Sequence, residues 1–271
     1  MERKYYSYTK ERLCEGRIPT RVMDDSQAVF RAMAQEMADT IEENGRKGDR
    51  SVLIVPVGPV GQYPHFVQLV KERRISLKDC WIINMDEYLG DDGKWIDPSS
   101  PLSFRGFMEH SLYSQLPEEL NVPASQRIFP DPADPGKVTR LIEELGKVDL
   151  CLGGIGINGH LAFNEAEEVD ADTFATRVTR VIDISRETRC ANAIGDLGGA
   201  IDAMPRKAVT IGMREILSAR KVRLGVFRTW HRAVVRQAIF DEPSGHFPVT
   251  LLQKHPDAQI YINDVASEVA F

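Results

Sequence analysis

Apolar residues follow two patterns along this chain, and the two patterns alternate. Short runs rich in valine and isoleucine predict buried strands at 51–57, 80–84, 148–152, 208–211, 222–227 and 256–262. Between them, apolar residues recur every three or four positions, as in amphipathic helices. The first such segment begins at Ser26, places Val29, Met33 and Met37 on one face, and can end at Gly45. Further helices are predicted at about 62–73, 104–112 and 138–145, and after each of the strands at 208–211 and 222–227.

This alternation of strands and helices, without hairpin signals, predicts the fold class. We expect a single three-layer α/β domain over 1–271, with a mainly parallel Rossmann-like sheet and helices on both faces. Residues 1–24 are polar, aromatic and basic without a clear period, and we interpret them as an N-terminal arm. The arm could pack on its own domain or on a neighbouring subunit of a homo-oligomer.

Composition narrows the classes of function. Lysine and arginine total 34 against 40 acidic residues, a formal charge of −6, which argues against a nucleic-acid partner. The four cysteines, Cys14, Cys80, Cys151 and Cys190, lie far apart without metal-binding or redox spacing, which fits a reducing compartment. No apolar run approaches the length of a membrane span. We therefore expect a cytoplasmic protein with no nucleic-acid or membrane partner.

The candidate chemistry is concentrated in the stretch that follows the predicted strand at 148–152. Its sequence, G-G-I-G-I-N-G-H-L-A-F-N-E, spans 153–165 and contains four glycines, which permit sharp turns or a close ligand. His160 lies in this loop and Glu165 follows five residues later. A carboxylate near a histidine fixes its tautomer and raises its pKa, which is typical of an acid–base site. A tight turn with one hydrogen-bonded histidine is the alternative.

Two other strand ends carry candidate residues. The loop after the strand at 51–57 reads G-P-V-G-Q-Y-P, and could bind an anion through backbone N–H groups or be a plain turn. Asp86 and Glu87 follow the strand at 80–84, and only one of them can face a crevice, because neighbours on a strand point to opposite faces. Ligand crevices in open α/β sheets lie beyond the carboxyl ends of the strands.

At these residues the chain resembles a known family. The stretches N-M-D-E-Y-L-G at 84–90 and 153–165 resemble the two signature stretches of glucosamine-6-phosphate deaminases (isomerases), and 205–213 and 251–256 are similar to later family segments. The resemblance covers roughly 51–262. Related 6-phosphogluconolactonases also carry a G-x-G-x-D-G-H loop but usually continue into Thr-Ala-Ser, so L-A-F-N-E favours the deaminase branch.

The resemblance implies an amino-sugar isomerisation coupled to loss of ammonia, without metal or organic cofactor. It makes Asp86 the base that moves a proton between C2 and C1, and His160 the group that assists ring opening, held by Glu165 and Asn158. The substrate, a phosphorylated or otherwise anionic sugar, would contact a second set of residues: Gly58, Gly61, Gln62, Gly156, Arg189 and His231.

Most departures from the family pattern lie at the positions where the family binds the sugar phosphate. Position 158 is Asn where many members have Asp, and Pro59, Val60 and Tyr63 stand where the family has glycine and hydroxyl residues. His231 appears in place of a phosphate-binding lysine, while Arg189 matches a phosphate-binding arginine. We therefore expect poor catalysis with glucosamine 6-phosphate and a substrate whose far end differs, with Arg189, Arg228 and Gln62 able to compensate.

Three alternatives stay open from the sequence. One is a same-fold sugar isomerase or lactonase that releases no ammonia. Another is a non-catalytic sugar-phosphate-sensing domain, although the roughly 50 residues before the first predicted strand show no helix-turn-helix pattern. A catalytically silent relative of the enzyme is the third.

Overall fold

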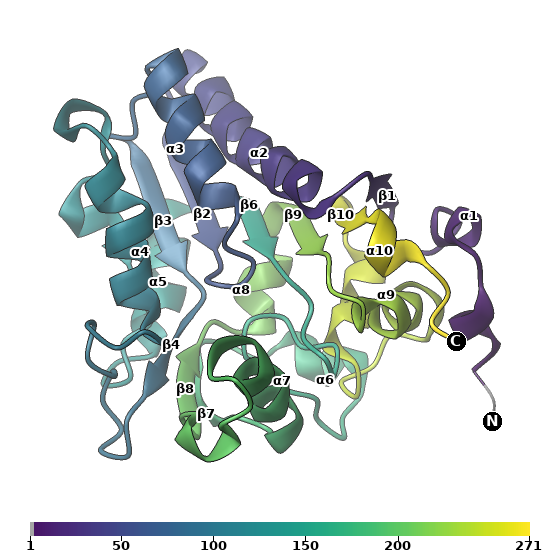
Figure 1. Cartoon of the computed structure of the whole chain (residues 1–271). Helices are drawn as coiled ribbons and strands as arrows, with labels where there is room; N and C mark the ends of the chain where they lie inside the picture. The colour runs from purple at the N-terminus through teal and green to yellow at the C-terminus, as the bar shows by residue number, and fades with distance from the viewer. Residues whose placement is uncertain (1–2) are drawn as a thin grey trace.

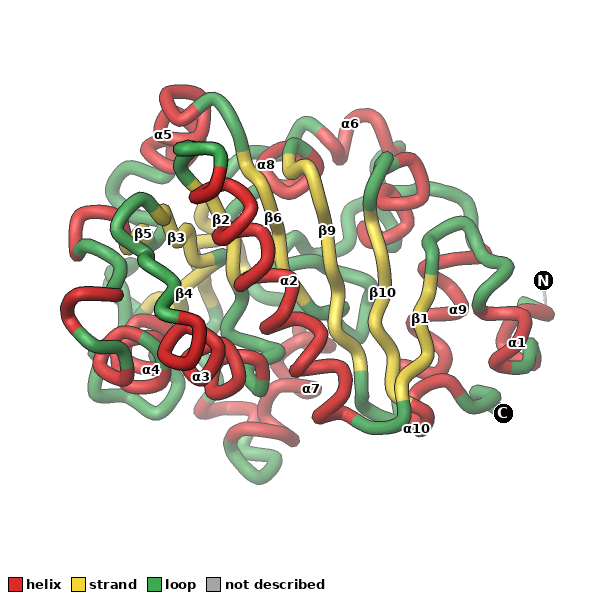
Figure 2. The backbone as a smooth tube through the Cα atoms, turned by 90° about the horizontal axis from the view of Figure 1, so that it is seen from above, coloured by secondary structure: helices red, strands yellow, loops and turns green. Residues whose placement is uncertain are grey.

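A seven-stranded parallel sheet forms the centre of the molecule in the computed structural model, which describes residues 3–271 (Figure 2). Its order is β1-β10-β9-β6-β2-β3-β5, and every neighbouring pair is parallel. The strands are β1 (Thr20–Met23), β2 (Ser51–Val55), β3 (Cys80–Asn84), β5 (Arg127–Ile128), β6 (Val148–Gly153), β9 (Ala219–Val226) and β10 (Ala258–Asn263). The expected three-layer α/β class is confirmed.

Helices cover both faces of this sheet. The α-helices are α1 (Lys10–Leu13), α2 (Ser26–Arg46), α3 (Gln62–Arg73), α4 (Phe104–Ser111), α5 (Gly136–Leu145), α6 (Ala171–Ala175), α7 (Arg186–Asp196), α8 (Met213–Leu217), α9 (His231–Phe240) and α10 (Asp264–Ser267). Because side chains alternate along a strand, Leu53 and Val55 pack into one core with α2 and α3, whereas Val52 and Ile54 pack into the other with α8 and α9.

A second, antiparallel sheet was not predicted. It has the order β4-β8-β7, with β4 (Asp86–Leu89), β8 (Lys207–Thr210) and β7 (Arg180–Asp183). Only Met85 separates β3 from β4: its N–H donates to Val55 in the large sheet, and its carbonyl accepts from Ile211 beside the small one. The chain thus leaves one sheet for the other without a turn residue, so the sequence carried no signal for the change.

The N-terminal segment packs on this same domain. Tyr5 and Tyr6 hydrogen-bond through their hydroxyls to Asp241 and Gln237, at 3.0 Å each, at the end of α9. The prediction that 1–24 is wholly an arm is wrong for 20–23, which form the edge strand β1 on β10.

The strand order reverses direction between β2 and β6, and this defines a switch point. From β2 the chain builds outward through β3 and β5, then returns to add β6 on the opposite side of β2. In Figure 1 the small sheet and α7 lie beyond the carboxyl ends of β2, β3 and β6. A crevice is expected at this point in open α/β sheets.

Candidate active site

A cavity of about 560 Å³ lies at the switch point. Its walls come from the segments after β2, β3, β6 and β9, together with α7 and the start of α4. Asp86 and His160 both line it, although they belong to different strand ends. Two side chains that can exchange protons therefore line one cavity.

Asp86 and its neighbour Glu87 have opposite environments. Glu87 is fully buried, and its carboxylate accepts hydrogen bonds from the Ser103 hydroxyl and from the backbone N–H groups of Tyr88, Phe104 and Arg105, at 2.9–3.0 Å. Among residues 3–271, by contrast, no group donates to the Asp86 carboxylate, which is 6% exposed. Burial, and then the charge of Glu87, raises the pKa of Asp86 well above its usual range. Asp86 thus faces the cavity with a raised pKa and without a hydrogen-bond donor.

His160 is held by a chain of polar groups. Its Nδ1 lies 2.7 Å from the Asn158 side-chain oxygen, and the Asn158 amide donates to Glu165 at 2.6 Å. An amide oxygen only accepts, so Nδ1 carries the proton and Nε2 keeps its lone pair. Glu165 also accepts from the Ser185 N–H at 3.2 Å. Burial lowers the pKa of His160, and the Glu165 charge, 3.8 Å from Nδ1, partly opposes that effect.

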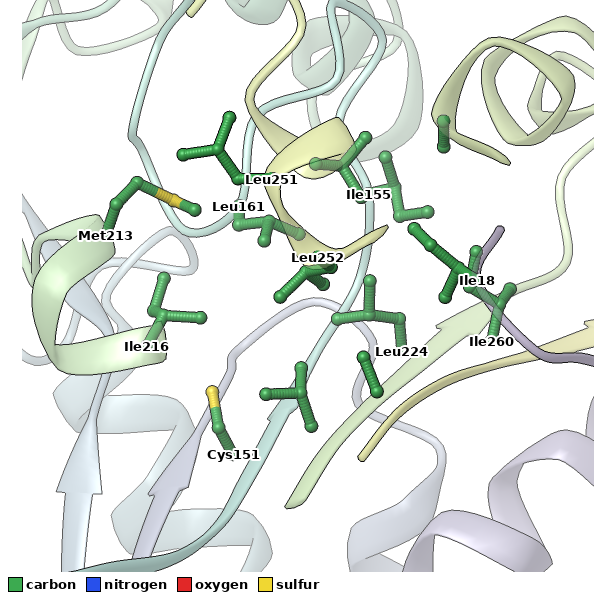
Figure 3. Close-up of a cluster of buried hydrophobic side chains, with 14 of the residues drawn as sticks. Ile18, Cys151, Ile155, Leu161, Met213, Ile216, Leu224, Leu251, Leu252 and Ile260 are labelled. Carbon is green, nitrogen blue, oxygen red and sulfur yellow. The ribbon is translucent and has the colours of Figure 1, made fainter. Parts of the chain in front are cut away.

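The loop that carries His160 is fixed to the core on both sides of the histidine. Ile155 and Leu161 are buried in one hydrophobic cluster with Leu251 and Leu252 (Figure 3). Gly156 lies directly against the imidazole: a Cβ at this position would be 2.0–2.3 Å from three ring atoms of His160. Gly156 therefore leaves the space that the histidine ring occupies.

The glycine loop after β2, residues 58–61, lines the cavity. Gly58 and Gly61 line the cavity, whereas Gln62 is fully buried outside it and donates to the Pro59 carbonyl at 2.9 Å. The expectation that Gln62 contacts substrate therefore has no support in this geometry. Gly61 is required by packing, because a Cβ there would lie 2.2 Å from the Phe30 ring.

The cations expected at the anion grip are mostly engaged elsewhere. His231 accepts from the Arg228 N–H at 2.9 Å through Nδ1 and approaches the Ile155 carbonyl at 3.0 Å through Nε2. Burial lowers its pKa to about 3, so His231 lines the cavity as a neutral side chain and not as a cation. Arg189 donates to the Ile201 and Met204 carbonyls and is absent from the cavity wall.

Arg228, which the sequence suggested only as a residue able to compensate at the anion site, is the exception. It is exposed and lines the cavity, and no ion pair or hydrogen bond of its guanidinium is found within residues 3–271. Thr188 was missed altogether: its hydroxyl lies 3.3 Å from Nδ1 of His160. Thr188 lies in no glycine-rich or acidic motif, so only the tertiary structure reveals it.

The described part of the chain offers neither a metal-binding cluster nor a membrane-spanning helix. Within residues 3–271, no group of three or more histidine, cysteine, aspartate or glutamate side chains could hold a metal ion. None of the described helices combines the length and apolar character that crossing a membrane requires.

The fold and the paired acid–base groups define the chain as an α/β enzyme, and comparisons identify its family. A glucosamine-6-phosphate deaminase from Mycoplasma mycoides is 30% identical over 240 residues, covering 87% of this chain and 92% of that protein. A namesake from Thermoanaerobacter pseudethanolicus is 28% identical over 244 residues, covering 89% and 92%. The chain belongs to the glucosamine-6-phosphate deaminase family. No family model matches it.

Solved structures agree with this assignment. A monomeric glucosamine-6-phosphate deaminase of the NagB superfamily superposes with a TM-score of 0.79 at 26% identity, covering 92% of this chain and 98% of that one. A 6-phosphogluconolactonase from Shewanella baltica reaches 0.63 at 17% identity, covering 90% and 97%. The second likeness is one of fold alone.

Proposed function

We propose that the protein converts an amino sugar with an anionic far end into the corresponding ketose and ammonia. One observation carries this proposal: Asp86 and His160 face a single cavity at the switch point, one as a carboxylate without donors and the other with a free Nε2. Membership of the deaminase family supports the same reading. The relatives are named for glucosamine 6-phosphate, which indicates an amino sugar as the substrate class. The group at the end of the sugar distant from C1 and C2 is not determined by that name.

Each reacting group has a defined task in this proposal. His160 exchanges a proton with the ring oxygen through Nε2, which opens the sugar ring. Asp86 then removes the C2 proton, and the C–H electrons form the C1=C2 double bond. The π electrons of the C1 aldehyde move to its oxygen, which takes a proton from water, and the enolamine results. Returning that proton to C1 leaves an iminium at C2; water adds there, the C–N bond breaks, and ammonia leaves. The sum is amino sugar plus water giving ketose plus ammonia.

Asn158 and Glu165 act as positioning residues. The amide of Asn158 holds Nδ1 of His160 protonated, and Glu165 orients that amide through a 2.6 Å hydrogen bond. Because Asn158 is neutral, the negative charge is one residue further from the imidazole than an aspartate at 158 would place it. This supports a histidine that is neutral when substrate arrives.

The location proposed for this reaction is the cytoplasm. All four cysteines are free, and Cys80 and Cys151 are buried, as expected for thiols that are kept reduced.

The experiment is an ammonia-release assay over a panel of free and anionic amino sugars, with 6-phosphogluconolactone hydrolysis measured in parallel. We expect ammonia from at least one amino sugar and its loss in Asp86→Asn. Hydrolysis of the lactone without ammonia from any amino sugar would instead assign the protein to the lactonase alternative.

A further inference from the structure

We propose that the far end of the substrate carries a single negative charge, a carboxylate bound by Arg228, and that the enzyme acts on 2-amino-2-deoxyhexuronates. This assignment rests on the proposed function, because it concerns the end of the sugar distant from C1 and C2. It follows from the charges and donors that face the cavity.

Arg228 is the only lysine or arginine among the described residues of the cavity wall. It lies on the loop between β9 and α9, with its guanidinium 5.9 Å from the centre of the Phe227 ring. Two other nearby arginines are committed elsewhere: Arg189 to backbone carbonyls, and Arg232 to the Val265 carbonyl and Glu268. One guanidinium therefore faces the substrate.

Negative groups oppose even this one charge. The carboxyl-terminal end of α7 approaches Arg228, since a Cβ on Gly195 would lie 3.2 Å from Nη1. Asp196, the last residue of α7, also lines the cavity, and the helix terminus adds partial negative charge. Burial raises the pKa of Asp196 and the charge of Arg228 lowers it, so the two groups interact.

Two residues at the expected phosphate site offer it no donor. Pro59 has no N–H, and the ring nitrogens of His231 are occupied. Apolar and aromatic side chains complete this part of the wall: Phe30, Val60, Phe227 and Trp230. A phosphate monoester brings about 1.5–2 negative charges and three acceptor oxygens. A carboxylate brings one charge and two oxygens, which one guanidinium can bind in a bidentate pair.

The same chemistry operates on a hexuronate without any additional reactant. The carboxylate occupies C6, whereas the proton shuttle, iminium formation and hydrolysis involve only C1, C2 and the ring oxygen. A 2-amino-2-deoxyhexuronate plus water thus gives a ketohexuronate plus ammonia.

The test separates binding at the far end from catalysis. The probes are the C1-reduced, open-chain forms of glucosamine 6-phosphate and of 2-amino-2-deoxyglucuronate, which have no C1 carbonyl and cannot isomerise. Their dissociation constants are measured by calorimetry for the wild type, Arg228→Met, Asp196→Asn and Arg46→Met. Arg46 is an exposed arginine at the end of α2, outside the cavity wall, and controls for loss of one positive charge.

We expect the wild type and Arg46→Met to bind the carboxylate probe more tightly than the phosphate probe. Arg228→Met should lose about 10- to 100-fold in affinity for the carboxylate and so lose the preference. Asp196→Asn should improve phosphate binding by up to about fivefold, because it removes an opposing charge.

Equal or tighter binding of the phosphate probe by the wild type would overturn the proposal. So would a carboxylate preference that survives in Arg228→Met. If the binding pattern holds but no amino sugar yields ammonia, the proposed reaction fails while the assignment of the subsite stands.

Discussion

Replacing Gly156 by alanine tests whether His160 is placed by the space that this glycine leaves. The added Cβ would lie 2.0 Å from Cε1, 2.1 Å from Nε2 and 2.3 Å from Nδ1 of the imidazole. Non-bonded contacts to a Cβ below 3.0 Å are essentially never seen, so the ring must move by about 1 Å. The ring cannot stay where it is.

That displacement is large compared with the interactions that hold the ring. The bond from Nδ1 to Asn158 is 2.7 Å long, and a 1 Å shift away from its partner would take it out of hydrogen-bonding range. A misplacement of about 1 Å can reduce rate by roughly 10²-fold. We therefore expect kcat/KM for ammonia release to fall by about 10²-fold or more, with the ring-opening step most affected.

The control is Gly45→Ala on α2, where an added Cβ meets nothing within 4 Å. Alanine in a helix interior is favoured over glycine by about 0.5–1 kcal/mol, so this variant should be slightly more stable and fully active. Thermal unfolding of both variants shows whether Gly156→Ala is still folded. A folded Gly156→Ala enzyme with wild-type kcat/KM would refute the role assigned to this close contact.

Three further substitutions probe the groups around the two reacting residues. Asp86→Asn should lower turnover by about 10²–10⁴-fold. Its free energy of unfolding at neutral pH, measured by calorimetry, should be higher than that of the wild type by about 0.5–2 kcal/mol. The gain in stability is expected because the raised pKa of Asp86 makes the native state bind more protons than the unfolded chain. Asp86 therefore lowers the free energy of unfolding as the pH rises above the pKa of an unfolded aspartate. An Asp86→Asn variant less stable than the wild type would contradict this reasoning. Glu87→Gln should move the acidic limb of the kcat/KM profile to lower pH, because it removes the charge that helps to raise the pKa of Asp86. Ser103→Ala removes one donor to Glu87 and leaves its charge, so it should not shift this limb. An acidic limb at the same pH in both variants would count against the effect. In Asn158→Asp, the new carboxyl group would face Glu165 at the 2.6 Å that now separates the amide from the carboxylate. The two carboxyl groups should therefore share a proton, and they should raise the pKa of His160 only above the pH at which that proton is lost. NMR titration of the imidazole measures this change. A His160 titration identical to that of the wild type at every pH would show that the pair does not form.

Sequence patterns predicted the parts of this fold that depend on periodicity. The strands at 80–84 and 148–152 and the helix face of Val29, Met33 and Met37 appear where the apolar residues required them. The small antiparallel sheet escaped prediction because β4 follows β3 after one residue, and β8 was expected in the parallel sheet. Pairing partners are set by tertiary contacts, which a single strand's composition does not encode.

For the site, residues that carry a motif were easier to find than those that do not. His160, Asn158 and Glu165 lie within eight residues of one another, so a local loop was enough to predict their contact. The anion subsite that we propose lies instead between the β9–α9 loop and the end of α7, which are about thirty residues apart in the chain. The neutral state of His231 depends on burial and on three backbone partners that the sequence does not reveal.

The adjacent carboxylates show most directly how structure divides roles that sequence leaves open. Strand geometry required one of Asp86 and Glu87 to face away from the crevice, but it could not say which side chain would be solvated by the protein. The amino-terminal turn of α4 decides this, because its N–H groups and Ser103 surround Glu87 and leave Asp86 without a donor. The same turn places Phe104 and Phe107 in the cavity wall. Helix α4 therefore holds Glu87 in place by hydrogen bonds, and the charge of Glu87 helps to raise the pKa of Asp86.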